Sequence, residues 1–117
     1  MSVKRVVPNL PAGGTAETER LLVDILGFEK QMDMGWVMTF VSGENSATQV
    51  TVLNADPSGL HPEVTIEVAD VDAIHARVVE AGLQVVYGPA DEPWQVRRFF
   101  VSLPNGALIN VMGHLVT

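Results

Sequence analysis

Glu63 stands at the start of a β-branched segment, two residues after His61. Alternate residues of a strand share one face, so these two side chains can point the same way and form half of a metal site. Without a metal, a carboxyl group held in a dry pocket can act as a general acid or base near neutral pH. The alternative is an exposed glutamate at a strand start. We carry Glu63 forward as the candidate catalytic residue.

Two adjacent arginines, Arg97 and Arg98, lie in a later β-branched segment. Strand alternation must point one of them inward and the other outward. An inward guanidinium can hold a substrate carboxylate or phosphate through paired hydrogen bonds. The alternative is an ion pair with Asp91, with Glu92 or with a partner subunit. The sequence alone does not tell which arginine faces inward.

Large apolar side chains alternate along one segment, Trp36, Met38 and Phe40, and therefore share a face. Ligand sites are mostly apolar and aromatic, with a few polar groups that fix orientation. Trp94 and Phe99 offer further aromatic surface in the second half of the chain. We expect these residues to line a pocket, although the same alternation is also typical of a hydrophobic core.

Other chemistry is less favoured. His75 falls within a predicted helix and His114 beyond the last predicted strand, where a lone histidine is usually solvated or structural. The chain has no cysteine, which excludes disulfides and thiolate catalysis. It has no nucleophile beside a base, no phosphate-binding loop and no dinucleotide fingerprint. Asn110 could supply one oriented hydrogen bond.

The composition predicts one soluble globular domain over residues 1–117, with 47% hydrophobic and 18% charged residues. The net charge of −7 argues against nucleic acid and against an anionic membrane surface as partners. No segment approaches the roughly 18 apolar residues of a membrane span. We therefore expect a cytoplasmic protein whose partner is a small molecule.

The same order of elements occurs twice: a strand, a helix and three strands. Asp70 is the expected cap of the second helix. Gly27 and Gly82 both end a predicted helix and lie 55 residues apart, and Trp36 and Trp94 both precede the third strand, 58 residues apart. This predicts an internal repeat in which neither half closes its core alone. The predicted modules cover residues 3–54 and 63–114, joined by a linker over 55–62. The predicted strands are 3–10, 28–33, 36–41, 48–53, 63–68, 83–87, 96–102 and 108–112.

Several segments in this order resemble the vicinal oxygen chelate superfamily, which contains glyoxalase I, bleomycin-resistance proteins and extradiol dioxygenases. They are Asp24-Ile25-Leu26-Gly27-Phe28, the strand and helix start from Val64 to Ala73, Trp94-x-x-Arg97-x-Phe99, and Pro104-Asn105-Gly106 through Val111. The resemblance implies an α+β fold, with two βαβββ modules forming a curved, barrel-like mixed sheet around a pocket, commonly in a homodimer. It also aligns Arg97 with an arginine of the family.

Metal-dependent relatives place His, Glu or Gln ligands on the first and last strands of each module. By position the resemblance maps these ligands to about Val7, Gln49 or Thr51, Glu63 and Asn110. Because Val7 cannot coordinate an ion and only Glu63 is a strong ligand, we expect no metal and no other cofactor.

Three functions stay open. The first is a metal-free binding protein, similar to the bleomycin-resistance branch, for an aromatic or amphipathic ligand. The second is a lyase, isomerase or dioxygenase that uses Glu63 as acid or base, or a metal held by Glu63, Gln49 and His61. The third is an association domain with a vestigial pocket. The expected ligand-binding residues are Trp36, Met38, Phe40, Trp94, Arg97, Phe99 and Asn110.

Overall fold

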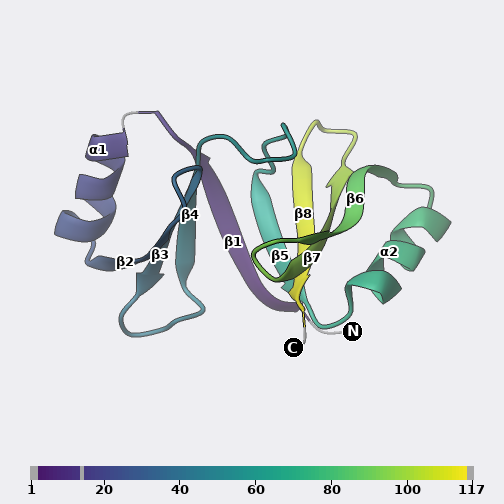
Figure 1. Cartoon of the computed structure of the whole chain (residues 1–117), viewed down its shortest axis with the longest axis horizontal. Helices are drawn as coiled ribbons and strands as arrows, with labels where there is room; N and C mark the ends of the chain where they lie inside the picture. The colour runs from purple at the N-terminus through teal and green to yellow at the C-terminus, as the bar shows by residue number, and fades with distance from the viewer. Residues whose placement is uncertain (1–2, 14, 116–117) are drawn as a thin grey trace. The chain divides into compact units, whose positions relative to one another are not determined.

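A computed structural model describes residues 3–13 and 15–115 of the chain (Figure 1). The chain forms two compact units, each with its own sheet and helix. The N-terminal unit spans Val7–His61. The C-terminal unit begins at Pro62 and also includes the start of the chain as far as Val6.

The N-terminal unit has a four-stranded sheet in the order β2-β3-β4-β1. Strands β2, β3 and β4 are antiparallel neighbours, and the second half of β1 pairs parallel with β4. Leu22 of the helix packs against Phe40 and Val52, which gives this unit its core. The elements are β1 (Val3–Pro11), α1 (Thr15–Glu19), η1 (Arg20–Ile25), β2 (Phe28–Asp33), β3 (Val37–Ser42) and β4 (Gln49–Leu53).

The first helix ends where it was predicted to end, but its second half is wider than an α-helix. It continues from α1 into the π-helical segment η1, where the amide of Leu26 donates to the carbonyl of Leu21 at 2.9 Å. Gly27 then adopts a φ of +81°, a conformation that glycine accepts without steric cost. Leu21, Ile25 and Leu26 are left exposed.

The C-terminal unit repeats this plan with the strand order β5-β8-β7-β6. Strands β5 and β8 are parallel, whereas β8, β7 and β6 are antiparallel neighbours. The helix α2 begins as predicted, because the Asp70 carboxylate accepts a hydrogen bond from the amide of Ala73 at 3.1 Å. The elements are β5 (Val64–Val68), α2 (Val71–Glu80), β6 (Gln84–Glu92), β7 (Val96–Ser102) and β8 (Leu108–His114).

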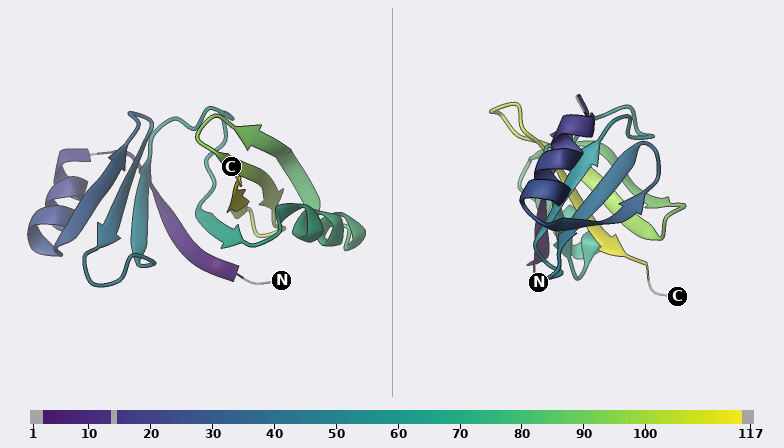
Figure 2. Two further views of the ribbon diagram at one scale, coloured as in Figure 1. Left: turned by 60° about the horizontal axis from the view of Figure 1, so that its bottom comes forward. Right: turned by 90° about the vertical axis from the view of Figure 1, so that its left-hand side faces the viewer.

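Each helix covers one face of its own sheet, as the two views in Figure 2 show. In the C-terminal unit, Val71 of α2 packs against a buried cluster that includes Phe99, Val101 and Val111. Both units therefore have the order strand, helix, strand, strand, strand that the sequence predicted. Within residues 3–13 and 15–115, no helix has the length and apolar character that a membrane crossing requires.

Most strand bounds agree with the prediction to within one residue, and the two larger differences both matter for the site. Strand β6 was predicted to stop at Tyr87 but continues to Glu92. Its pairing with β7 shifts at Gly88-Pro89, and β6 lies at the outer end of the strand order, where a proline is tolerated. Strand β8 was predicted to stop at Met112 but reaches His114, so that this histidine belongs to the sheet.

Candidate functional site

The two faces of the C-terminal sheet differ in chemistry. The face covered by α2 holds a buried apolar cluster. On the other face, the register places Arg98 opposite Met112 and sets Asn110 between Phe100 and Thr65. We call this the helix-free face. Its side chains are those of Thr65, Glu67, Tyr87, Glu92, Val96, Arg98, Phe100, Asn110, Met112 and His114.

Arg98 is the buried charge of the helix-free face. Its Nε lies 2.6 Å from Oε2 of Glu92, and the two side chains are 4% and 10% exposed. Its guanidinium carbon also lies 4.9 Å from the ring centre of Trp94 and 4.8 Å from that of Phe100. A guanidinium surrounded by aromatic rings gains cation–π attraction in addition to its ion pair. Arg98 therefore holds both the β6–β7 hairpin and the Trp94 ring.

Tyr87 completes this cluster. Its hydroxyl donates to Oε2 of Glu92 at 2.9 Å, and its ring centre lies 4.8 Å from that of Phe100. Burial, followed by the hydrogen bond to Glu92, raises the pKa of Tyr87 above its usual value, although Arg98 acts in the opposite direction. The phenol therefore stays protonated and serves as a donor to Glu92.

Asn110 carries an unpaired buried acceptor. Its side-chain nitrogen donates to the hydroxyl of Thr65 at 3.2 Å, and the residue is only 7% exposed. Its Oδ1 is buried and has no hydrogen-bond partner. Leaving a buried polar atom unpaired costs about 1–3 kcal/mol. A ligand that donates a hydrogen bond to Oδ1 would recover that energy, so the orienting role expected for Asn110 stays a prediction with a polar atom to carry it.

Arg97 and Phe99 lie on the face covered by α2, across the sheet from Asn110. Arg97 pairs with Asp72 at 2.8 Å and with Asp91 at 2.9 Å, and these two carboxylates raise its pKa. This is the alternative that the sequence left open for the arginine pair. Phe99 has no exposed surface. Strand alternation therefore prevents these two residues from lining one surface together with Asn110.

Trp36, Met38 and Phe40 of the N-terminal unit, which were expected to line a pocket, also lie in different surroundings. Met38 packs with Phe40 beside Leu22, and Phe40 has no exposed surface. The shared face of these residues is thus the core under the helix. Trp36 precedes β3 and is half-buried, and its carbonyl accepts from the amide of Asn54 at 2.7 Å.

The proposed metal ligands Gln49 and His61 lie near opposite ends of one strand. The His61 ring contacts the carbonyl of Leu53, the last residue of β4, at 3.3 Å. Gln49 is the first residue of β4, four residues away at about 3.3 Å each, or about 13 Å. One ion cannot bind both side chains. Glu63 is exposed just before β5, and its amide donates to the carbonyl of Leu108 at 2.9 Å.

The strand register also shifts the positions that the family's metal ligands would occupy. Thr51 pairs with Asn9 and Asn110 pairs with Thr65, so Asn9 and Thr65 take the places expected for Val7 and Glu63. In each unit this gives one amide and one hydroxyl, whereas transition metals prefer imidazole, thiolate or carboxylate ligands. Among residues 3–13 and 15–115, no three acidic or histidine side chains gather closely enough to hold an ion. These residues do not fit a catalytic metal.

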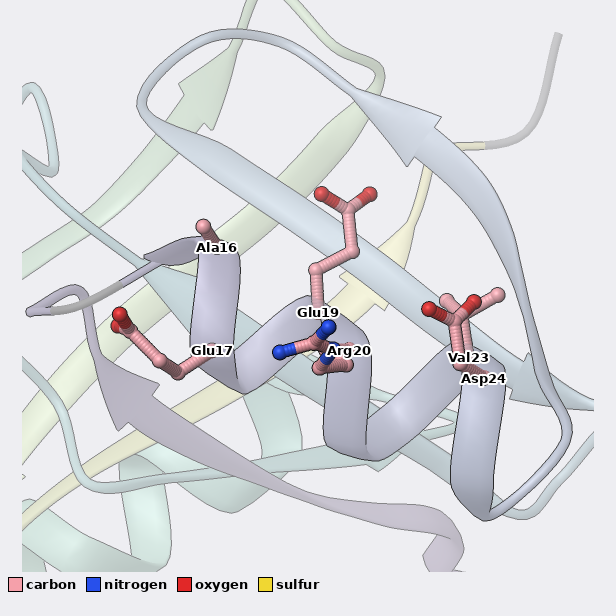
Figure 3. Close-up of a pocket in the computed structure, with 6 residues that line it drawn as sticks. All are labelled: Ala16, Glu17, Glu19, Arg20, Val23 and Asp24. Atoms are coloured by element: carbon pink, nitrogen blue, oxygen red, sulfur yellow. The ribbon is translucent and has the colours of Figure 1, made fainter.

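A separate depression of about 480 Å³ lies over the helix of the N-terminal unit. Figure 3 shows polar side chains of α1 and η1 projecting around it. Its lining consists of Ala16, Glu17, Glu19, Arg20, Val23 and Asp24. None of the site residues expected from the sequence belongs to it, and Glu19 is already paired with Lys30 at 2.9 Å.

The sequence interpretation missed a charged group beside the arginine cluster. Glu67 is 14% exposed and lies 2.7 Å from Nε of Arg5 and 3.0 Å from Nδ1 of His114. Strand alternation could have indicated that His114 lies on this face. Asn110, Met112 and His114 share one face if β8 extends as far as His114.

The family profile of the Glyoxalase/Bleomycin resistance protein/Dioxygenase superfamily matches residues 5–111. The chain belongs to this superfamily. The predicted resemblance is therefore confirmed, and so is the predicted fold class of the glyoxalase/bleomycin-resistance type. No curated protein matches the chain.

Solved structures of this superfamily share the fold. A superfamily member from Vibrio splendidus 12B01 is 21% identical, with a TM-score of 0.72 over 96% of this chain and 99% of its own. A Mn(II)-bound glyoxalase from Novosphingobium aromaticivorans is 20% identical, with a TM-score of 0.67 over 95% of this chain. An extradiol ring-cleaving dioxygenase from B. fuscum is 16% identical, with a TM-score of 0.72 over 98%. This chain covers 38% and 34% of the last two proteins.

Proposed function

We propose that this chain is a small-molecule-binding member of the superfamily that works without a metal. Its ligand binds to the helix-free face of the C-terminal sheet, beside the half-buried Trp94. The observation that carries the proposal is the unpaired Oδ1 of Asn110 on a face with buried aromatic rings. Apolar surface with one oriented polar group is the usual composition of a ligand site.

The charges on the helix-free face favour a neutral ligand. Arg98 is compensated by Glu92, and Arg5 is compensated by Glu67. On the opposite face, Arg97 already holds two aspartates. A carboxylate or phosphate ligand would have to break a buried pair, which is costly. The ligand that fits is a flat, uncharged molecule with a hydroxyl or N–H group that donates to Asn110.

The test is a fluorescence titration with two ligands that share a naphthalene ring, 2-naphthol and 2-naphthoate, after removal of metals with a chelator. A Trp36→Phe background leaves Trp94 as the reporting tryptophan. We expect 2-naphthol to change the emission saturably and 2-naphthoate to bind at least about tenfold more weakly, a difference of about 1.4 kcal/mol. No saturable change with either ligand would contradict the binding function. Equal binding of both would contradict the neutral-ligand argument alone.

We also propose that the chain forms a homodimer and that it is located in the cytoplasm. Leu21, Ile25 and Leu26 of the first helix region are 48%, 68% and 58% exposed, which supports an apolar contact between copies in a homodimer. Light scattering on the eluting protein tests this. We expect twice the chain mass, with loss of the dimer when Ile25 is replaced by Glu, and a monomeric mass at all concentrations would contradict it.

A further inference from the structure

A carboxylate and an imidazole form a dyad at one end of the helix-free face. Oε2 of Glu67 lies 3.0 Å from Nδ1 of His114, and its Oε1 lies 2.7 Å from Nε of Arg5. The Glu67 side chain is 14% exposed, whereas that of His114 is 58% exposed. The inner member is thus held between two partners, and the outer member reaches solvent.

This contact determines which nitrogen of the imidazole carries the proton. An ionised carboxylate can only accept hydrogen bonds, so neutral His114 donates through Nδ1 and keeps a lone pair on Nε2. The backbone beside the ring is also fixed, because the amide of Leu115 donates to the carbonyl of Gln95 at 2.9 Å. A base oriented by a carboxylate in this way is a recurrent device of enzymes that transfer protons.

We propose that His114 is a general base whose Nε2 removes a proton from a substrate on the helix-free face, with Glu67 as its positioning residue. The imidazolium that forms is stabilised by the adjacent Glu67 carboxylate. Arg5 pairs with Oε1 of Glu67 and so holds the carboxylate in place while Oε2 faces His114. This activity goes beyond binding and uses neither Glu63 nor a metal.

The substrate class follows from the neighbours of His114. Val96 lies directly opposite it on β7, and the preceding turn carries Trp94. The half-buried Trp94 presents apolar surface, Val96 is buried, and the nearby charges of Arg98 and Glu92 are already paired. The substrate that fits is a neutral, flat molecule with a weakly acidic C–H or O–H bond.

The probe is 5-nitrobenzisoxazole, a flat neutral carbon acid. Nε2 takes the proton from C3, the C–H electron pair forms the nitrile, and the N–O bond breaks to release a coloured phenolate. We compare the wild-type protein with His114→Ala and, as the control, His61→Gln, because His61 contacts the Leu53 carbonyl instead of a carboxylate. A positioned base contributes about 10²–10⁴-fold, so we expect His114→Ala to lower the rate at least about tenfold and His61→Gln to leave it unchanged.

A second measurement does not depend on any variant folding. Long-range ¹⁵N–¹H spectra report the tautomer of each histidine, and we expect neutral His114 to carry its proton on Nδ1. Glu67→Gln should lower the maximal rate with little change in the probe's KM and should move the proton to Nε2. Equal rates for wild type and His114→Ala, or an Nε2–H tautomer in the wild type, would overturn the proposal. Neither measurement uses 2-naphthol, so the general-base proposal and the binding proposal can be contradicted separately.

Discussion

Arg98 and Glu92 form an ion pair with 2.6 Å between Nε and Oε2, and neither side chain is more than one-tenth exposed. The adjacent Arg97 forms pairs of similar length, but its side chain is 34% exposed. The two arginines thus differ in burial and in face while sharing their residue type and strand. This makes them a matched pair for measuring how much the buried cluster contributes to the free energy of unfolding.

Replacing Arg98 should be far more costly than replacing Arg97. Arg98→Met leaves the Glu92 carboxylate buried without its cation, and breaking such a pair costs about 3–5 kcal/mol. Arg97→Met removes solvent-screened pairs worth about 0–1 kcal/mol. Urea unfolding of the two variants checks this, and equal losses of stability would contradict the burial of Arg98. The double variant Arg98→Met with Glu92→Gln should recover part of the loss.

Tyr87 is the only tyrosine of the chain, so its ionisation can be followed by absorbance. Because folding raises its pKa, the native protein should titrate above the value of about 10 found in unfolded chains. The resulting stabilisation is present below about pH 10 and is lost as the pH rises through the pKa of the folded state. A native midpoint at or below that of the urea-unfolded protein would contradict the burial of the phenol beside Glu92.

Replacing Asn110 should change the free energy of unfolding only slightly. Asn110→Leu keeps the branched shape and the number of side-chain heavy atoms and removes the unpaired acceptor, but it also loses the hydrogen bond to Thr65. These two effects, each about 1 kcal/mol, oppose each other, so the unfolding free energy should change by less than about 1.5 kcal/mol. A large loss of stability, measured by urea unfolding, would show that Oδ1 has a structural partner.

Gly113 should resist even the smallest side chain. A Cβ there would lie 2.9 Å from the Val71 side chain and 3.1 Å from the Val68 carbonyl, because β8 passes close to the start of α2. Gly113→Ala should therefore cost about 1–3 kcal/mol. Gly13→Ala is the control, since nothing lies within 4 Å of the added carbon. Thermal unfolding of the two variants compares them, and similar midpoints would contradict the close approach.

Local signals made much of the fold predictable. The Asp70 cap and the glycine stop at Gly27 depend on residues close in the sequence, and both were predicted correctly. The end of β6 was not, because a Gly-Pro pair normally breaks a strand and only a shift in pairing with β7 lets the strand continue.

The site was harder to predict, because alternation shows which residues share a face but not what covers that face. Met38 and Phe40 do share one, but it is the face under the helix. The same ambiguity left the choice between Arg97 and Arg98 open until the register with β8 was known. The Glu67–His114 contact joins residues 47 positions apart, so no local pattern could reveal it.

The most direct test of the binding account is the 2-naphthol titration, measured with the Trp36→Phe protein and with the same protein carrying Asn110→Leu. The account predicts saturable binding to the first and at least about tenfold weaker binding to the second, because a buried hydrogen bond worth about 1.4 kcal/mol is lost. Equal affinities for both proteins, with both folded, would contradict a ligand site at Asn110 on the helix-free face.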